Sequence, residues 1–183
     1  MQIEETALKG VFILSPKVWG DDRGWFFESY SKRTLEKLGI KCDFVQDNHS
    51  KSAQVHTLRG IHFQKNPSCQ AKLVRCTAGR IYDYAVDLRK DSPDYLKWIR
   101  VELSAENKKQ IFIPRGFGHA FLTLEENCEV MYKTDDFYSP EHDGGIRWND
   151  PDIGIDWGDI APVLSEKDRK SPFVSESAPE FYM

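Results

Sequence analysis

Hydrophobic and polar positions alternate over short stretches of this chain, and a period of two is typical of β-strands. The segment RIYDYAVDLR (80–89) is one example. Turn-forming residues such as AGR (78–80) and PRGFG (114–118) separate the stretches. Many short strands at this spacing predict an antiparallel sandwich or barrel. We expect strands over residues 11–14, 25–29, 44–48, 58–64, 72–77, 80–88, 98–103, 110–113, 119–124 and 130–134.

Two short helices interrupt the strand pattern. Ser31 is placed to cap the first helix, and Gly39 to end it. LSEKDRK (164–170) predicts a second helix with Ser165 as its cap. The segment 139–157 is rich in Gly, Pro and Asp, so we expect a long ordered loop there.

Length and composition narrow the class of protein. A chain of 183 residues is the size of one domain, so we expect a single all-β domain over residues 1–183. The net charge of −4 argues against a nucleic-acid partner. We find no signal peptide and no apolar stretch near the ~20 residues of a membrane span. The four cysteines form no CxxC pair, which favours free thiols and a cytoplasmic location.

The predicted strand 58–64, LRGIHFQ, carries more polar residues than a core strand needs. Strict alternation places His62 with Gln64 on one face, and Arg59 with Phe63 on the other. His62 is therefore either a hydrogen-bonded core residue or part of a polar pocket.

Four other polar residues fall on strand positions where a sandwich is usually apolar. Each has a structural explanation: Lys72 could protect a sheet edge, Asp83 could satisfy a turn, and His119 and Tyr132 could be hydrogen-bonded core residues. However, a barrel interior lined by His, Lys, Tyr and Asp would be costly if it were dry and unpaired. Together these residues therefore favour a pocket.

A metal in this pocket has little support from the sequence. Metal-binding barrels of the cupin type often use an HxH pair, a following carboxylate and a later His. Here the second and third of these positions are Gln64 and Gln70, so only His62 and His119 remain. A catalytic zinc site usually has three protein ligands. We therefore predict neither a metal nor a cofactor.

The same residues fit acid–base chemistry. Histidine is the natural general base near neutral pH, so His62 is the candidate base. The Lys72 ammonium could stabilise an oxyanion, and the Tyr132 hydroxyl could donate a proton. A base on one wall and an acid on the other would invert a carbon beside a ketone.

Several longer segments carry a resemblance to one family. The segments DDRGWFFESY, FVQDNHSKS, LRGIHFQKNPSCQAKLVR, IRWNDPDIGIDW and LSEKD occur in this order. They resemble the dTDP-4-dehydrorhamnose 3,5-epimerases over nearly the whole chain. The resemblance implies a cupin-type antiparallel jelly-roll barrel with a few short helices, active without a metal as a homodimer that exchanges N-terminal strands. The implied reaction converts dTDP-4-dehydro-6-deoxy-D-glucose to dTDP-4-dehydro-L-rhamnose, a step toward the rhamnose of bacterial surface polysaccharides.

The resemblance also implies a role for individual residues. His62 would be the base, Asp168 its orienting carboxylate, Lys72 the stabiliser of the enolate, and Tyr132 the proton donor. Arg59 would contact the diphosphate, and Phe26 or Tyr138 would stack near the base of the nucleotide. The segment 46–48 could reach in from the partner chain. The implied substrate-binding residues are Arg23, Phe26, Glu28, Gln46, Asp47, Asn48, Arg59, Asp83, His119, Tyr138, Asp143 and Lys167.

Three alternatives stay open beside this hypothesis. The nearest is an epimerase that inverts only C3 or only C5 of a related dTDP-4-keto-hexose, which would use the same His–Tyr chemistry. A cupin metalloenzyme is disfavoured by Gln64 and Gln70. A non-catalytic module that binds sugar nucleotides is disfavoured because such a module needs no acid and base.

Overall fold

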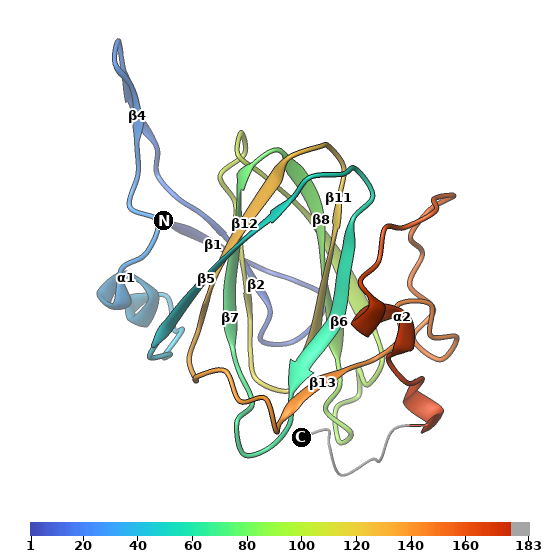
Figure 1. Cartoon of the computed structure of the whole chain (residues 1–183). Coiled ribbons are helices and arrows are strands. Elements are labelled where there is room, and N and C mark those ends of the chain that lie inside the picture. The colour runs from blue at the N-terminus through green and yellow to red at the C-terminus, as the bar shows by residue number, and fades with distance from the viewer. Residues whose placement is uncertain (177–183) are drawn as a thin grey trace.

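Two antiparallel sheets face each other and enclose the interior of the protein (Figure 1). The computed structural model describes residues 1–176. One sheet has six strands, in the order β1 (Gln2–Glu5), β2 (Phe12–Ser15), β10 (Gln110–Ile113), β7 (Lys72–Ala78), β12 (Cys128–Thr134) and β5 (Gln46–Ser52). The other has five strands, in the order β13 (Asp143–Gly145), β6 (Leu58–Gln64), β11 (Phe117–Thr123), β8 (Arg80–Asp87) and β9 (Trp98–Ser104). The prediction of an all-β jelly-roll barrel is confirmed.

Most predicted strands are present, and the differences are concentrated near the N-terminus. The prediction of one strand over 25–29 is wrong. Instead, β3 (Trp19–Asp21) and β4 (Gly24–Phe26) pair as a hairpin that projects from the body (Figure 1). Strand β5 begins two residues later than predicted and extends to Ser52. Strands β1 and β13 were not predicted, and β13 lies within the segment 139–157 that we expected to be a loop.

The space between the sheets is filled by the inward-facing side chains of the alternating strands. Val74 and Cys76 of β7 and Ile81 and Ala85 of β8 belong to one buried cluster, because alternate residues of a strand share a face. Burial of this apolar surface is the main stabilising contribution to such a fold.

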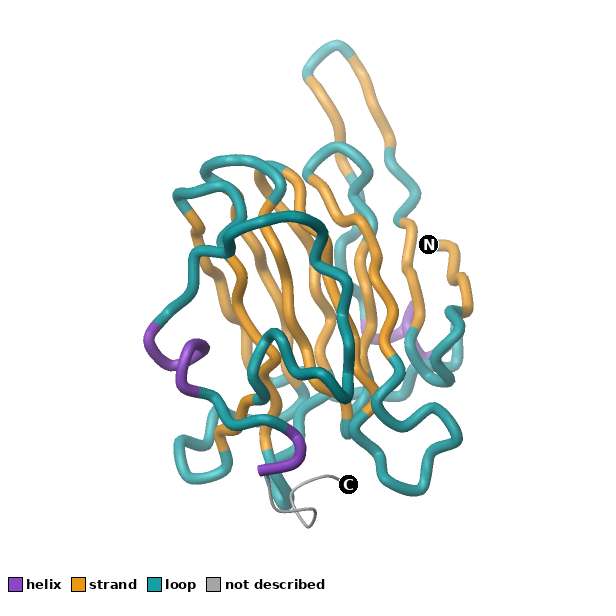
Figure 2. The backbone as a smooth tube through the Cα atoms, turned by 90° about the vertical axis from the view of Figure 1, so that its right-hand side faces the viewer, coloured by secondary structure: helices purple, strands orange, loops and turns teal. Residues whose placement is uncertain are grey.

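The outer faces of both sheets are covered. Helix α1 (Lys32–Lys37) contributes Leu35 to a cluster on the six-stranded sheet. On the five-stranded sheet, the segment 146–157 contributes to a second cluster, and α2 (Glu166–Lys170) and the 3₁₀ helix η1 (Val174–Glu176) follow it (Figure 2). Both predicted helix caps are confirmed, because the hydroxyls of Ser31 and Ser165 each accept a backbone N–H from the first turn. None of the helices in residues 1–176 is long and apolar enough to cross a membrane.

Strand β6 departs from strict alternation in a way that shapes the interior. His62 pairs with His119 and Arg59 pairs with Phe121, so two residues of β6 lie opposite one residue of β11. This β-bulge turns Arg59 and His62 toward the same cavity. The prediction that they face opposite sides is therefore wrong. Gly60 permits the bulge: its φ is +131°, and a Cβ there would lie 2.4 Å from the Cβ of Ala120.

Candidate active site

A cavity of about 420 Å³ lies between the two sheets and is lined by residues of both. Its wall is mostly polar or charged, in contrast to the apolar cluster that fills the rest of the interior. The lining residues are Gln46, Asn48, Ser50, Arg59, His62, Phe63, Gln64, Gln70, Lys72, His119, Phe121, Tyr132, Tyr138, Asp143 and Lys167.

His62 and Asp168 form a hydrogen-bonded pair on one wall of the cavity. Nε2 of His62 lies 2.5 Å from Oδ1 of Asp168, which comes from α2. The Asp168 side chain is 3% exposed, whereas that of His62 is 34% exposed and reaches the cavity. Burial opposes ionisation of Asp168, but the hydrogen bond and charge of His62, together with Ser165 and Lys167, outweigh it and hold the pKa of this carboxyl below its usual value. An ionised Asp168 fixes the orientation of the imidazole through this hydrogen bond.

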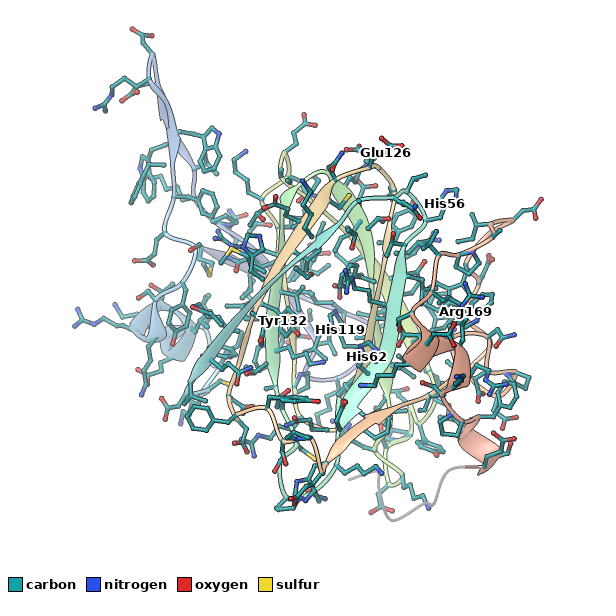
Figure 3. All side chains as sticks on the ribbon, in the orientation of Figure 1. His56, His62, His119, Glu126, Tyr132 and Arg169 are labelled. Carbon is teal, nitrogen blue, oxygen red and sulfur yellow. The ribbon has the colours of Figure 1, made fainter. Side chains whose placement is uncertain are left out.

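The opposite wall carries Lys72 and Tyr132. Both come from the six-stranded sheet, and Tyr132 and His62 lie on opposite sides with His119 between them (Figure 3). Nζ of Lys72 lies 5.9 Å from the centre of the Tyr132 ring. Burial lowers the pKa of Lys72 to about 8 although the negative charge of Asp83 opposes this change. Burial also raises the pKa of Tyr132, so this phenol keeps its proton at neutral pH.

A second histidine–aspartate pair is more deeply buried and belongs to the same five-stranded sheet as His62. Nε2 of His119 lies 2.8 Å from Oδ2 of Asp83, and their side chains are 7% and 0% exposed. Burial lowers the pKa of His119, so its imidazole is neutral at physiological pH. The other carboxylate oxygen of Asp83 has no hydrogen-bond partner within residues 1–176. This buried pair places a carboxylate charge close to Lys72.

Charged and aromatic side chains line the mouth of the cavity. Asp143 forms an ion pair with Lys167 and accepts a hydrogen bond of 3.3 Å from the Tyr138 hydroxyl. Arg59 lies on the wall with its Nε bonded to the Ser52 hydroxyl at 3.2 Å. The mouth thus offers cationic groups to an anionic ligand, which suits phosphate oxygens.

Of the predicted substrate-binding residues, Asp83 is fully buried and does not line the cavity, and four others lie away from the cavity of their own chain. Asp47 is on the outer face of β5, where its carboxylate pairs with Nζ of Lys133 at 2.7 Å. Arg23 pairs with its neighbour Asp21 on the projecting hairpin. Phe26 is 69% exposed on the same hairpin. Glu28 follows the hairpin, and its carboxylate accepts a hydrogen bond from a nearby threonine.

Comparison with known proteins places this site in a family. A family model described as dTDP-4-dehydrorhamnose 3,5-epimerase matches residues 5–176. A protein of that name from Salmonella typhimurium is 51% identical over 179 residues, which span 97% of each chain. The chain belongs to the dTDP-4-dehydrorhamnose 3,5-epimerase family. It is therefore an isomerase of dTDP-sugar biosynthesis.

Solved structures show two activities on this fold. A dTDP-6-deoxy-D-glucose-3,5-epimerase from Legionella pneumophila, in complex with dTDP-4-keto-L-rhamnose, has a TM-score of 0.93 and 42% identity, covering 99% of this chain and 96% of its own. A 3′-monoepimerase from Streptomyces bikiniensis, in complex with dTDP-quinovose, has a TM-score of 0.86 and 31% identity, covering 93% and 86%. The fold of the epimerase family therefore accommodates single as well as double inversion.

Five residues that line this epimerase site were not among the predicted site residues. Alternation connects four of them to predicted site residues, because Gln64 shares a face with His62, Gln70 with Lys72, Ser50 with Asn48, and Phe121 with His119. Phe63 is the exception, because strict alternation places it on the face opposite His62. The five residues are Ser50, Phe63, Gln64, Gln70 and Phe121.

The two glutamines that replace metal ligands of other cupins bond to backbone instead. Nε2 of Gln64 donates to the carbonyl of Ser68 at 2.7 Å, and Nε2 of Gln70 donates to the carbonyl of Asp136 at 2.8 Å. Residues 1–176 contain no cluster of three His, Cys, Asp or Glu side chains that could hold a metal ion.

Proposed function

We propose that this chain converts dTDP-4-dehydro-6-deoxy-D-glucose to dTDP-4-dehydro-L-rhamnose by metal-free acid–base catalysis through enolates. The observation that carries the proposal is the placement of His62 and Tyr132 on opposite walls of one cavity (Figure 3). The Legionella relative, which contains dTDP-4-keto-L-rhamnose, supports the same substrate class.

His62 would remove the proton in each inversion. Asp168 accepts the hydrogen bond of Nε2, so the lone pair of Nδ1 remains available to the substrate. His62 would take a proton from a carbon beside the C4 ketone, and the electrons of the broken C–H bond would move onto the C4 oxygen. The ammonium group of Lys72 would stabilise the resulting enolate.

Tyr132 would complete the inversion from the other side. Its phenol donates a proton to the same carbon on the opposite face, and the C4 ketone is restored as the enolate collapses. The phenolate then recovers a proton from solvent, while His62 releases the proton that it took. The same sequence at the second carbon yields the L-configured product.

We further propose a homodimer in which the β3–β4 hairpin of one protomer completes the nucleotide site of the other. The hairpin projects from the body (Figure 1). On it, Trp25 and Phe26 are 62% and 69% exposed. Arg23 and Glu28, at and beside the hairpin, would then contact the nucleotide sugar. Sedimentation should give twice the chain mass, and Phe26→Ala should weaken dTDP binding; a monomer with full dTDP affinity would contradict this arrangement.

Proton NMR with the substrate in D₂O tests the reaction itself. Deuterium at both C3 and C5, with the L-configured product trapped by a reductase, is the expected result. Deuterium at one carbon alone would instead identify a monoepimerase, the activity of the Streptomyces relative. No exchange at either carbon would contradict the acid–base mechanism. Metal analysis of the active protein tests the metal-free proposal.

A further inference from the structure

The segment 146–157 lies on the outer face of the five-stranded sheet and contributes no residue to the cavity wall (Figure 2). It is firmly attached there. Ile146 exchanges two backbone hydrogen bonds with Ile61, of 2.9 and 3.2 Å. The indole N–H of Trp157 donates to the carbonyl of Trp148 at 2.9 Å, and Trp157 is buried. The proposed reaction gives this segment no role.

Helix α2, which carries Asp168, cannot define its own position. It has five residues, and helices this short are unstable in isolation. Its N-terminal side is anchored to the start of β6, because Leu58 and His56 exchange backbone hydrogen bonds with Val163. The Ser165 hydroxyl accepts the backbone N–H of Asp168.

The C-terminal side of α2 is anchored by Arg147. Nε of Arg147 donates to the carbonyl of Ser171 at 2.8 Å, and its backbone N–H donates to the carbonyl of Pro172 at 2.9 Å. Its guanidinium carbon lies 4.4 Å from the centre of the Phe173 ring. The Ser171 hydroxyl in turn donates to the carbonyl of Lys167. A cationic donor at a helix C-terminus satisfies carbonyls that have no partner within the helix.

A second contact supports the same anchor. The buried carboxylate of Asp150 accepts the backbone N–H of Val174 at 2.7 Å. Its other oxygen accepts the backbone N–H groups of Asp152 and Ile153, which fixes Asp150 within the segment 146–157. Both ends of α2 are thus anchored to segments that bond to β6, the strand that carries His62.

We propose that Arg147 is a positioning residue of the epimerase reaction, which holds the C-terminal end of α2 so that Asp168 stays in hydrogen-bond contact with His62. Arg147 lines no part of the cavity and acts only through α2. This inference rests on the proposed function, because it assigns importance to the orienting carboxylate. Displacing a catalytic group by about 1 Å can reduce a rate about 10²-fold, even when the substitution is distant.

Steady-state kinetics of Arg147→Ala provide the first test. We expect kcat to fall about 10- to 100-fold, with the affinity for dTDP, measured by calorimetry, unchanged within twofold. Arg147→Lys keeps one donor and should recover part of kcat, and it also serves as the test if the alanine variant does not fold. The matched control is Arg169→Ala, which removes an exposed arginine of α2 itself (Figure 3) and should leave kcat within twofold.

A double variant distinguishes positioning from a general loss of stability. In an Asp168→Asn background, adding Arg147→Ala should lower kcat by a further factor of less than two. The contact between Asp168 and His62 that Arg147 supports is already lost there. A full additional 10- to 100-fold loss there, or a wild-type kcat in Arg147→Ala, would overturn the inference.

A spectroscopic readout separates this inference from the proposed function. The ring N–H proton of His62 should give a downfield NMR signal that is lost in Asp168→Asn. We expect Arg147→Ala to lose or broaden this signal and Arg169→Ala to keep it. A signal unchanged by Arg147→Ala would overturn the positioning role even if wild-type turnover is normal. Absence of deuterium exchange in the wild type, with the signal still sensitive to Arg147→Ala, would overturn the proposed function alone.

Discussion

Two histidine–aspartate pairs with similar geometry contribute their histidines to the cavity wall, and their surroundings differ. The Nε2–Oδ distances are 2.5 Å for His62 with Asp168 and 2.8 Å for His119 with Asp83. The side chain of His62 is 34% exposed, whereas that of His119 is 7% exposed. The same pair of residue types can therefore present a reactive nitrogen to a ligand or hold a buried charge in place.

The carboxylates differ in what they serve. Asp168 is bonded to a histidine that reaches the cavity, so its charge can assist a proton transfer. Asp83 contributes its charge to Lys72, whose pKa would be lower still without it. We therefore propose that the first pair takes part in the proton transfer and that the second sets the electrostatics of the cavity.

Alanine substitution of each histidine is the strongest test of this comparison. His62→Ala should lower kcat about 10²- to 10⁴-fold, since it removes the general base. His119→Ala should reduce thermal stability more than His62→Ala does. It leaves the buried carboxylate of Asp83 without its hydrogen-bond partner, which costs about 1–3 kcal/mol. Deuterium exchange and thermal melts measure the two effects. Full deuterium exchange by His62→Ala would contradict the assignment of His62 as the general base. The control is His49→Ala, which removes an exposed histidine.

Removal of the proton donor should separate the two halves of the inversion. Tyr132→Phe keeps the ring but loses the hydroxyl, so reprotonation should slow by about 10-fold or more while proton loss at His62 continues. In D₂O, deuterium should then enter the substrate faster than the inverted product accumulates. Unchanged production of the inverted sugar would remove Tyr132 from the mechanism. This variant leaves both histidine pairs intact, so it tests the opposite wall alone.

The pH profile should reveal the influence of the deeper pair. Burial lowers the pKa of Lys72 to about 8, so the ammonium that we propose stabilises the enolate is lost as pH rises through this value. We expect kcat to decline above about pH 8 for this reason. Asp83→Asn removes a negative charge that favours protonated Lys72, so the decline should begin at lower pH. A decline at the same or higher pH in this variant would contradict the electrostatic role of Asp83.

The smallest expected effect concerns a residue that touches neither pair. The amide of Gln64 donates to the carbonyl of Phe137 at 3.1 Å and accepts the backbone N–H of Ser139 at 2.7 Å, so it holds Tyr138 on both sides. Gln64→Ala should raise KM several-fold with kcat within about twofold, since uniform binding is lost. The exposed Gln54→Ala is the control. A large loss of kcat with unchanged KM would link Gln64 to the chemistry instead.

Much of the fold was available from local patterns. Alternation in β7 and β8 correctly assigned Lys72 and Asp83 to the interior, because a regular strand has a side-chain period of two. The caps at Ser31 and Ser165 were equally local, since each hydroxyl bonds a backbone N–H three residues away. Residue types alone also suggested acid–base chemistry.

Other features depended on contacts between distant segments. The hairpin β3–β4 was not predicted: a single strand was expected over 25–29, because local propensity did not show that the chain pairs with itself across a reversal at residues 22–23. Asp168 lies 106 residues from His62 in the chain, and no periodicity connects them. The resemblance to the epimerases assigned this partnership, and the packing of α2 against β6 provides its geometry.

The sequence by itself therefore determined the class of fold, the capped helices and the inward-facing residues of the regular strands, because these follow from local backbone geometry. Only the tertiary structure decided that Arg59 and His62 share one cavity, since the bulge opposite Ala120 depends on the register of two strands far apart in sequence. It also decided how Arg147 ties the end of α2 to the sheet layer that holds His62. Long-range packing sets such relationships, and a local pattern carries no information about them.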